Sequence, residues 1–172
     1  MESYSLHQLY DELINDLFSA ETQIEASLPQ WIDVASSADL REELNHYLVQ
    51  VRHHLDSLSQ IFEDLNEKPK GHRSGAVEGI VALMTQVVHH GGNSPVKDAG
   101  IIANLQRLQH YKMATYGTAR TFARHLDNNK AMDALQRALN EEGESDRKMT
   151  RLAEGGFLTK GINQEAQRVK TS

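Results

Sequence analysis

Four long stretches of this chain repeat apolar residues at steps of three and four positions. The first runs from Leu6 to Val34, the second from Leu40 to Leu65, the third from about Lys97 to Leu126, and the fourth from Met132 to Leu152. This spacing is typical of amphipathic helices, whereas strands alternate apolar and polar residues. Because each helix must bury its apolar stripe against another element, the sequence predicts an all-α helical bundle.

The connections between these stretches predict how the helices are arranged. Short links at residues 36–39 and 127–129 make the first and second helices, and the third and fourth, antiparallel neighbours. The link between the second and third is long: a polar loop over residues 66–75, a short helix from Ala76 to about His90, and a break at residues 91–95 that contains Gly and Pro. A four-helix bundle with one long crossover is the ferritin-like arrangement.

The length and composition favour a single domain. The chain has 172 residues, of which 39% are hydrophobic, and this is enough to fill one core. We assign residues 1–155 to the helical bundle. Residues 156–172 are mostly polar, and we predict a loose C-terminal tail there, although Phe157 and Leu158 could dock.

The charge balance argues against two kinds of partner. Lys and Arg number 18 against 24 Asp and Glu, for a formal charge of -6, so we expect no cationic face for nucleic acid or anionic lipid.

No stretch approaches the ~20 apolar residues of a membrane span, and the N-terminus does not resemble a signal peptide, so we expect a cytoplasmic protein. Cysteine is absent, so any metal site would need carboxylate and imidazole ligands.

Each of the four long helices interrupts its apolar stripe near mid-length with residues that a core disfavours. Burying an unpaired charge costs several kcal/mol or more, so four interruptions at matching depth are unlike random polar substitutions. They predict a buried polar layer, and function is best sought there. The residues are Glu21 in the first helix, Gln50 and His54 in the second, Gln109 and Lys112 in the third, and Glu142 and Asp146 in the fourth.

One interpretation of this layer is a metal centre. A carboxylate-bridged metal pair in a bundle takes a Glu from each of two helices and a Glu-x-x-His pair from each of the other two. The residual candidates for ligands to iron or manganese are Glu21, His54, Glu142 and Asp146. Such a centre would make the protein an enzyme that reacts with oxygen or peroxide.

A second interpretation is a metal-free ionic core, and the sequence favours it. Lys112 would pair with Glu21 and Glu142, and Gln50 and Gln109 would add hydrogen bonds. An ammonium inside a metal site would repel the metals, whereas in an ionic core it balances the carboxylates.

Two further interpretations of the polar residues stay open. Desolvation could lower the pKa of Lys112 and make it a nucleophile in a small-ligand site. Any single polar residue could also lie at the margin of its apolar stripe and reach solvent. The sequence identifies no catalytic residue.

The third helix carries a distinctive string at residues 105–117, which ends in His110-Tyr111-Lys112-Met113-Ala114-Thr115-Tyr116-Gly117. This string resembles the YciF/YciE-type ferritin-like family of bacterial stress proteins. Residues 19–23, 77–80 and 139–146 extend the similarity, which covers about residues 6–153. The resemblance implies a ferritin-like bundle that is often dimeric and has a carboxylate metal site.

The chain departs from the family pattern at the candidate ligands. Where the pattern has glutamates in the second and third helices, this chain has Gln50, Gln109 and Lys112, and Ala82 and Leu83 replace an acidic pair. Taken together with these departures, the resemblance predicts a homodimeric, stress-associated protein with a degenerate di-iron site and no cofactor, acting as a structural or interaction protein. The residues that keep acidic character are Glu21, Glu141, Glu142 and Asp146.

Overall fold

The computed structural model describes residues 5–71, 73–89, 94–156 and 159–169. They form six helices: α1 Leu6–Val34, α2 Ala38–Asp64, α3 Gly75–His89, α4 Pro95–His125, α5 Asn129–Glu154 and α6 Ile162–Gln167. Within these ranges there is no strand, as expected for the all-α fold, and one isolated bridge joins Gly155 and Lys160. The predicted break at residues 91–93, the end of the short helix at His90, and Phe157 and Leu158 lie outside the described residues.

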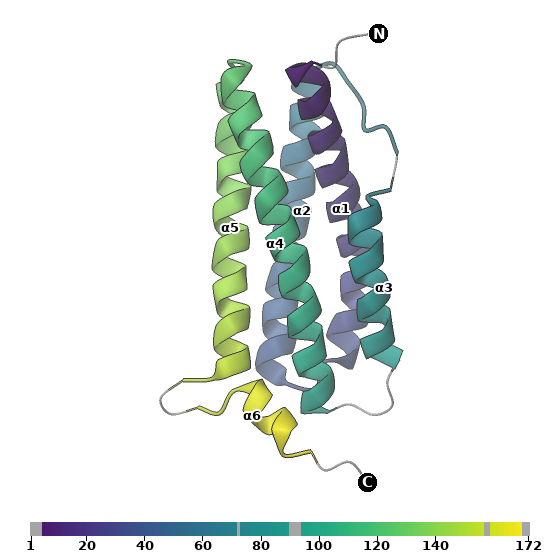
Figure 1. The fold of residues 1–172 in the computed structure, drawn as a ribbon, viewed down its shortest axis with the longest axis vertical. Coiled ribbons are helices and arrows are strands. Elements are labelled where there is room, and N and C mark those ends of the chain that lie inside the picture. Colours follow the sequence, from purple (N-terminus) through teal and green to yellow (C-terminus); the bar gives the residue numbers. More distant parts are fainter. Residues whose placement is uncertain (1–4, 72, 90–93, 157–158, 170–172) are drawn as a thin grey trace.

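The four long helices pack as two antiparallel pairs, α1 with α2 and α4 with α5 (Figure 1). After α2 the chain returns along the outside of the bundle through a loop and α3, which packs on α1 and α4. As a result, α4 starts from the same end of the bundle as α2. This is the single long crossover of the ferritin-like bundle, as the connection lengths predicted.

Side-chain caps fix where the long helices begin. Ser5 forms a capping box with Gln8, and the side chains of Ser37, Ser94 and Asn128 accept hydrogen bonds from the first turns of α2, α4 and α5. Such caps satisfy amide groups that have no partner within the helix. The short polar links therefore end one helix and start the next within a few residues.

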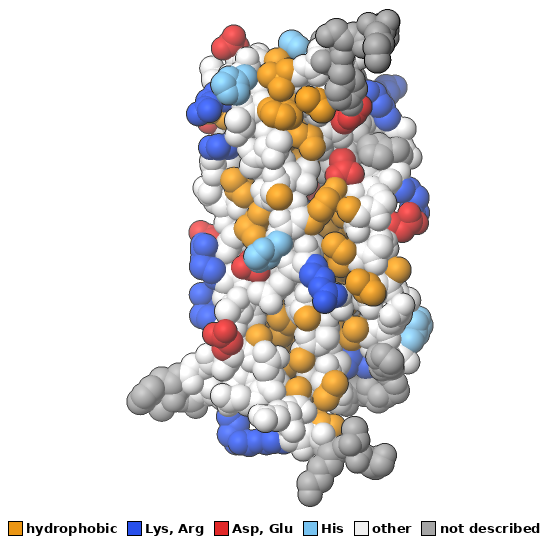
Figure 2. All heavy atoms as spheres, in the orientation of Figure 1, with side chains coloured by type: hydrophobic (Ala, Val, Ile, Leu, Met, Phe, Trp, Pro, Cys, Tyr) orange, Lys and Arg blue, Asp and Glu red, His pale blue; other side chains and the backbone are white. Residues whose placement is uncertain are grey.

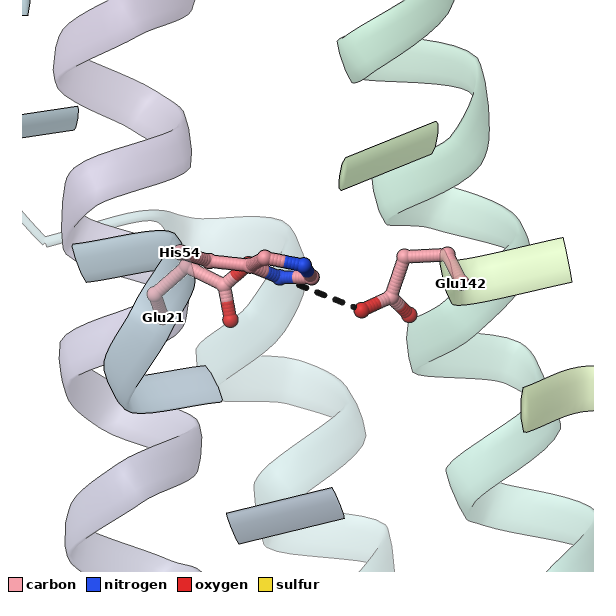
Figure 3. Close-up of side chains that lie close together, drawn as sticks. All are labelled: Glu21, His54 and Glu142. Carbon is pink, nitrogen blue, oxygen red and sulfur yellow. Dashed lines mark hydrogen bonds and ion pairs between the residues drawn. The ribbon is translucent and has the colours of Figure 1, made fainter. Parts of the chain in front are cut away.

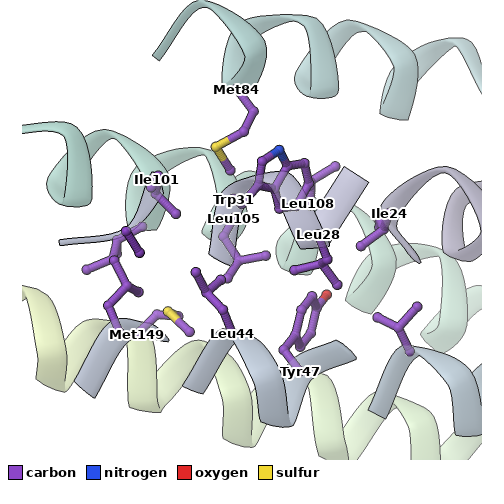
Figure 4. Close-up of a cluster of buried hydrophobic side chains, with 14 of the residues drawn as sticks. Ile24, Leu28, Trp31, Leu44, Tyr47, Met84, Ile101, Leu105, Leu108 and Met149 are labelled. Carbon is purple, nitrogen blue, oxygen red and sulfur yellow. The ribbon is translucent and has the colours of Figure 1, made fainter. Parts of the chain in front are cut away.

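The apolar core is divided into two clusters along the bundle. One cluster includes Leu28, Trp31, Leu44 and Leu105 (Figure 4). The other lies around Phe62 toward the opposite end. On every long helix one charged or titratable residue separates the two clusters: Glu21 between Leu17 and Ile24, His54 between Val51 and Leu58, Lys112 between Leu108 and Tyr116, and Glu142 between Ala138 and Met149.

The prediction of a loose C-terminal tail is wrong for residues 162–167. These residues form α6, which packs on α4 and α5, and its Ile162 is part of the apolar core. Two glycines allow the chain to fold back onto the end of α5. Gly155 has a φ of 80°, and a Cβ on Gly161 would lie 2.4 Å from the carbonyl oxygen of Ala153.

Candidate functional site

Lys112 on α4 lies at the centre of the layer between the two apolar clusters. Its Nζ is 2.6 Å from Glu142 Oε1 and 2.7 Å from Glu21 Oε2. It also donates a hydrogen bond to the Tyr47 hydroxyl at 3.0 Å. The side chains of Lys112, Glu21 and Glu142 are 0% exposed. Two carboxylates from α1 and α5 therefore share one buried ammonium.

Two tyrosine hydroxyls and one amide complete the bonding of these carboxylates. Tyr116 donates to Glu21 Oε1 at 2.6 Å, and Tyr47 donates to Glu142 Oε2 at 3.0 Å. The half-buried Gln50 donates its amide hydrogen to Glu142 Oε1 at 3.1 Å. Hydrogen bonds to a charged group are stronger than neutral ones, so these donors help to hold the carboxylates in place.

His54 on α2 also contacts the two buried carboxylates. Its Nδ1 is 3.0 Å from Glu21 Oε1 and 3.5 Å from Glu142 Oε1. Figure 3 shows these three side chains converging from α1, α2 and α5. The Nε2 atom is 2.8 Å from Glu141 Oε2, and the side chain of Glu141 is 48% exposed. His54 thus connects the buried charges to a surface carboxylate.

The charges of the layer decide the pKa of Lys112. Burial alone would lower the pKa of its ammonium, but Glu142 and Glu21 outweigh burial and raise the pKa above its ordinary value. This direction does not favour the open interpretation of Lys112 as a nucleophile with a lowered pKa, because a protonated amine has no free lone pair.

The two buried carboxylates respond in opposite directions. Burial raises the pKa of Glu21, but the charges of Lys112 and His54 outweigh it, and the pKa is lowered. Burial also raises the pKa of Glu142, and repulsion from Glu21 adds to this rise, so its pKa stays above the ordinary value despite Lys112. When two carboxylates share a site, their repulsion moves their pKa values apart in this way.

The sequence missed Tyr47 and Tyr116 as members of the layer. Both are buried, and burial together with the nearby carboxylates raises the pKa of each phenol well above its ordinary value. They therefore act as hydrogen-bond donors. A tyrosine suits an apolar helical stripe, so helical periodicity alone does not distinguish it from a core residue. The signals were their positions, within one or two turns of His54 and Lys112, and for Tyr116 also its place in the string at residues 105–117.

Two residues that were predicted to belong to the polar layer, Gln109 and Asp146, do not contact its charged groups. Gln109 is fully buried, but its amide donates to Ser145 Oγ at 2.9 Å, so it does not support the ion pairs as predicted. Its Oε1 has no hydrogen-bond partner among the described residues. Asp146 is half-buried at the edge of the bundle. Its Oδ1 accepts from Gln106 at 3.0 Å and lies 3.2 Å from Nε2 of the exposed His110.

The residues of the layer do not fit a divalent metal. In the part of the chain that the structure describes, one group has the spacing of metal ligands: Glu21, His54 and Glu142 offer atoms within 4.8 Å of one another. The ammonium of Lys112 is already in contact with both carboxylates, and a positive charge there repels a metal ion. A two-metal centre also needs more carboxylates than this set provides.

The fold and the layer together define a class of protein: an all-α bundle of four long helices with one crossover and a buried charged layer at mid-length. The chain belongs to the family described as "Domain of unknown function (DUF892)", which matches residues 5–167. It is 29% identical to Protein YciF of Escherichia coli (strain K12) over 164 residues, which are 95% of this chain and 99% of that protein. The resemblance to YciF-type proteins is confirmed.

Two solved structures have the same fold. The E. coli stress protein YciF matches with a TM-score of 0.85 and 26% identity over 97% of this chain and 100% of that one. YcfI of Rhodopseudomonas palustris, described as a candidate structural protein, matches with a TM-score of 0.82 and 30% identity. That match covers 87% of this chain and 96% of the other.

Proposed function

We propose that this protein is a stress-associated, ferritin-like bundle with a metal-free core, acting as a structural or interaction protein. The observation that carries the proposal is the position of Lys112, 2.6 and 2.7 Å from the two carboxylates that a metal would need. Two similar proteins support the stress-associated, structural role. E. coli YciF is described as a stress protein, and YcfI is described as a candidate structural protein.

The closure of the layer supports a role without catalysis. Glu21, Lys112 and Glu142 are inaccessible to solvent, and each has an opposite charge in contact. A cavity of about 420 Å³ lies near the α6 end of the bundle, where residues such as Asp39 and Thr159 line it, and none of its lining residues belongs to the layer. A substrate in that cavity would not reach the buried charges.

An interaction role is consistent with the outer surface of the bundle. On the face in Figure 2, hydrophobic side chains lie along the middle and charged ones mainly toward the edges. Leu83 on α3 and Val96 on α4 are 42% and 51% exposed. No helix among the described residues is long and apolar enough to cross a membrane. The homodimer, the cytoplasmic location and the absence of a nucleic-acid partner stay predictions.

Metal analysis tests the proposal directly. The protein would be purified without chelator, loaded anaerobically with Fe(II) or Mn(II), passed through a desalting column and analysed for bound metal. We expect no stoichiometric metal, because Lys112 keeps its charge. Two equivalents of tightly bound metal would show instead that the protein is a di-metal protein.

A variant that restores carboxylates offers the complementary test. We expect the triple substitution Gln50→Glu, Gln109→Glu and Lys112→Glu to bind Fe(II) or Mn(II), because it removes the ammonium and adds three acidic groups. The matched control is the double variant Gln50→Glu and Gln109→Glu, which keeps Lys112 and should stay metal-free. If the triple variant folds, as judged by circular dichroism, and binds no metal, Lys112 is not what excludes the ion.

A further inference from the structure

A cavity of about 420 Å³ lies between the first turns of α2 and the last turns of α5, at the end of the bundle where α6 packs (Figure 1). Its volume falls in the range of small-molecule sites, about 300–1,000 Å³. None of the residues that line it belongs to the charged layer at mid-length. This end cavity is therefore a separate place at which a ligand could bind.

The two helices that line the end cavity bring opposite charges to it. The α2 wall contributes Asp39, Glu42 and Glu43, and the α5 wall contributes Lys148 and Arg151. Within each wall, steps of three or four residues put charged side chains on one helix face. The helix dipole favours acidic residues at a helix start and basic residues at a helix end, which accounts for the residue types. It does not account for charges that share a cavity without pairing.

One ion pair joins the two walls. Lys148 Nζ lies 3.1 Å from Glu43 Oε1, so these two charges balance each other. Arg151 makes no ion pair or side-chain hydrogen bond with the residues that the structure describes, and the same holds for Asp39 and Glu42. The end cavity therefore has one unpaired cation on its α5 wall and two unpaired anions on its α2 wall.

A second, smaller cavity adjoins the first. Its volume is about 160 Å³, and Asp39 and Arg151 line both cavities. It adds one base, Lys160, and one acid, Glu165, so the excess of a single negative charge is unchanged. Leu152 also lines both cavities and packs against the apolar core. The site thus combines separated charges with apolar surface.

The unpaired charges of the end cavity define the chemistry of a complementary ligand. A guanidinium such as that of Arg151 binds a carboxylate through two parallel hydrogen bonds, and carboxylates bind ammonium or guanidinium groups. Two cationic groups and one carboxylate on a short methylene chain make up a basic amino acid.

We propose that the end cavity binds a free basic amino acid, such as arginine or lysine. Its carboxylate contacts Arg151, its two cationic groups contact Asp39 and Glu42, and its methylene groups lie on Leu152. The proposal goes beyond the function proposed above and does not depend on it, since the end cavity and the charged layer share no residue.

Isothermal titration of the full-length protein with L-arginine at low ionic strength tests the proposal. We expect saturable binding at one site per chain that weakens with added salt, because solvent and salt screen the exposed charges. Agmatine lacks the carboxylate of arginine, and L-citrulline lacks its charged side-chain group. Each should bind roughly fivefold more weakly, the upper value for an exposed ion pair. Equal binding of all three probes, or no binding of arginine at millimolar concentration, would overturn the proposal.

Substitution of Arg151 tests the contact with the ligand carboxylate. Arg151→Gln should bind arginine and agmatine equally, because it removes the group that distinguishes them. Arg147→Gln is the matched control, since Arg147 is an exposed arginine one turn earlier on α5 and does not line the cavity. If Arg151→Gln still prefers arginine over agmatine as the wild type does, the assigned contact is wrong.

Substitution of the acidic wall tests the contacts with the cationic groups. The double variant Asp39→Asn and Glu42→Gln should lose the preference for arginine over citrulline, whereas Asp56→Asn should keep it, because Asp56 is exposed on α2 outside the cavity. An unchanged preference in the double variant would contradict the proposal.

Backbone amide NMR of the wild-type protein locates the bound arginine. We expect the largest shifts in the first turns of α2 and the last turns of α5. Saturable shifts confined to other parts of the bundle would refute the end cavity as the site. A finding of bound metal in the charged layer would overturn the proposed function and leave this result unaffected.

Discussion

Lys112 remains charged without access to water because two carboxylates and one hydroxyl surround its ammonium. A buried ion pair contributes little net stability compared with a well-packed apolar core, since desolvation of the charges offsets their attraction. Removing one partner alone is strongly destabilising, because the charges that stay buried keep their desolvation cost and lose the attraction that offset it. Lys112 is therefore required for stability as long as Glu21 and Glu142 are buried beside it.

We expect Lys112→Met to lower the free energy of unfolding by about 3–5 kcal/mol at neutral pH. The substitution keeps a long side chain but leaves Glu21 and Glu142 close together without a cation. The loss should shrink at acid pH, where these carboxylates take up protons in the variant. Urea unfolding at several pH values measures both effects.

The matched control for this substitution is Lys130→Met. Lys130 pairs with Asp64 at 2.6 Å, but the side chain of Lys130 is 68% exposed and solvent screens the pair. Its replacement should change stability far less than that of Lys112. Unchanged or increased stability of Lys112→Met would mean that the ammonium does not balance the two carboxylates.

Helical phase predicts which residues share a face but not which atoms meet. It put Glu21, Lys112 and Glu142 on the apolar faces of three helices, where the structure has them in contact. It put Asp146 there too, because four residues after Glu142 the direction is nearly the same. Four residues turn a helix by about 400°, however, so Asp146 points about 40° away from Glu142, and its side chain is 18% exposed.

At the scale of the helices, Asp98 links the first turn of α4 to the connection between α1 and α2. It is 1% exposed, and its carboxylate accepts hydrogen bonds from Ser36 N at 2.8 Å, Ser36 Oγ at 2.6 Å and Ser37 N at 2.8 Å. The link joins residues about 60 positions apart in the chain. It therefore fastens the two helix pairs to each other at one end of the bundle.

We expect Asp98→Ala to lower the free energy of unfolding by about 1.5–3 kcal/mol, because it removes the charged acceptor of three hydrogen bonds from Ser36 and Ser37. Denaturant unfolding measures the loss, and hydrogen exchange should show faster exchange of the Ser36 and Ser37 amides. Asp39→Ala is the control, since Asp39 is an exposed acidic residue in the first turn of α2. Equal stability of both variants would rule out Asp98 as a link between the pairs.

The long helices were predictable because each repeats its apolar spacing over several turns. The range from Leu6 to Val34 coincides with α1, and the polar links coincide with the helix ends. The helix α6 was not predictable, because six residues are too few for a periodic pattern and only Ile162 is buried. Its position depends on the close approach of Gly161 to the end of α5, which is a tertiary contact.

At the scale of the whole molecule, α6 closes the end of the bundle at which α4 begins (Figure 1). Ile162 is 5% exposed and joins the apolar cluster that contains Leu105 and Met149. The C-terminal segment therefore completes the core, although most of its side chains are polar.

We expect Ile162→Ala to lower the free energy of unfolding by about 2 kcal/mol, near the lower end for the truncation of a buried aliphatic side chain. The site lies at the end of the core, where neighbouring groups can relax, and thermal or urea unfolding measures the change. Val169→Ala is the control, because Val169 is 46% exposed. A loss no larger than that of the control would indicate that α6 does not contribute to the stability of the bundle.

The division of the core into two apolar clusters also determines how the four long helices align along their axes. The clusters on both sides are apolar, so the charged layer adds a penalty of its own to a slide of one helix by a turn, about 5.4 Å. Such a slide would carry Glu21 or Lys112 into a cluster of leucine and isoleucine side chains, away from the opposite charge. Because that costs several kcal/mol, the charged layer helps to hold the four long helices in one axial register.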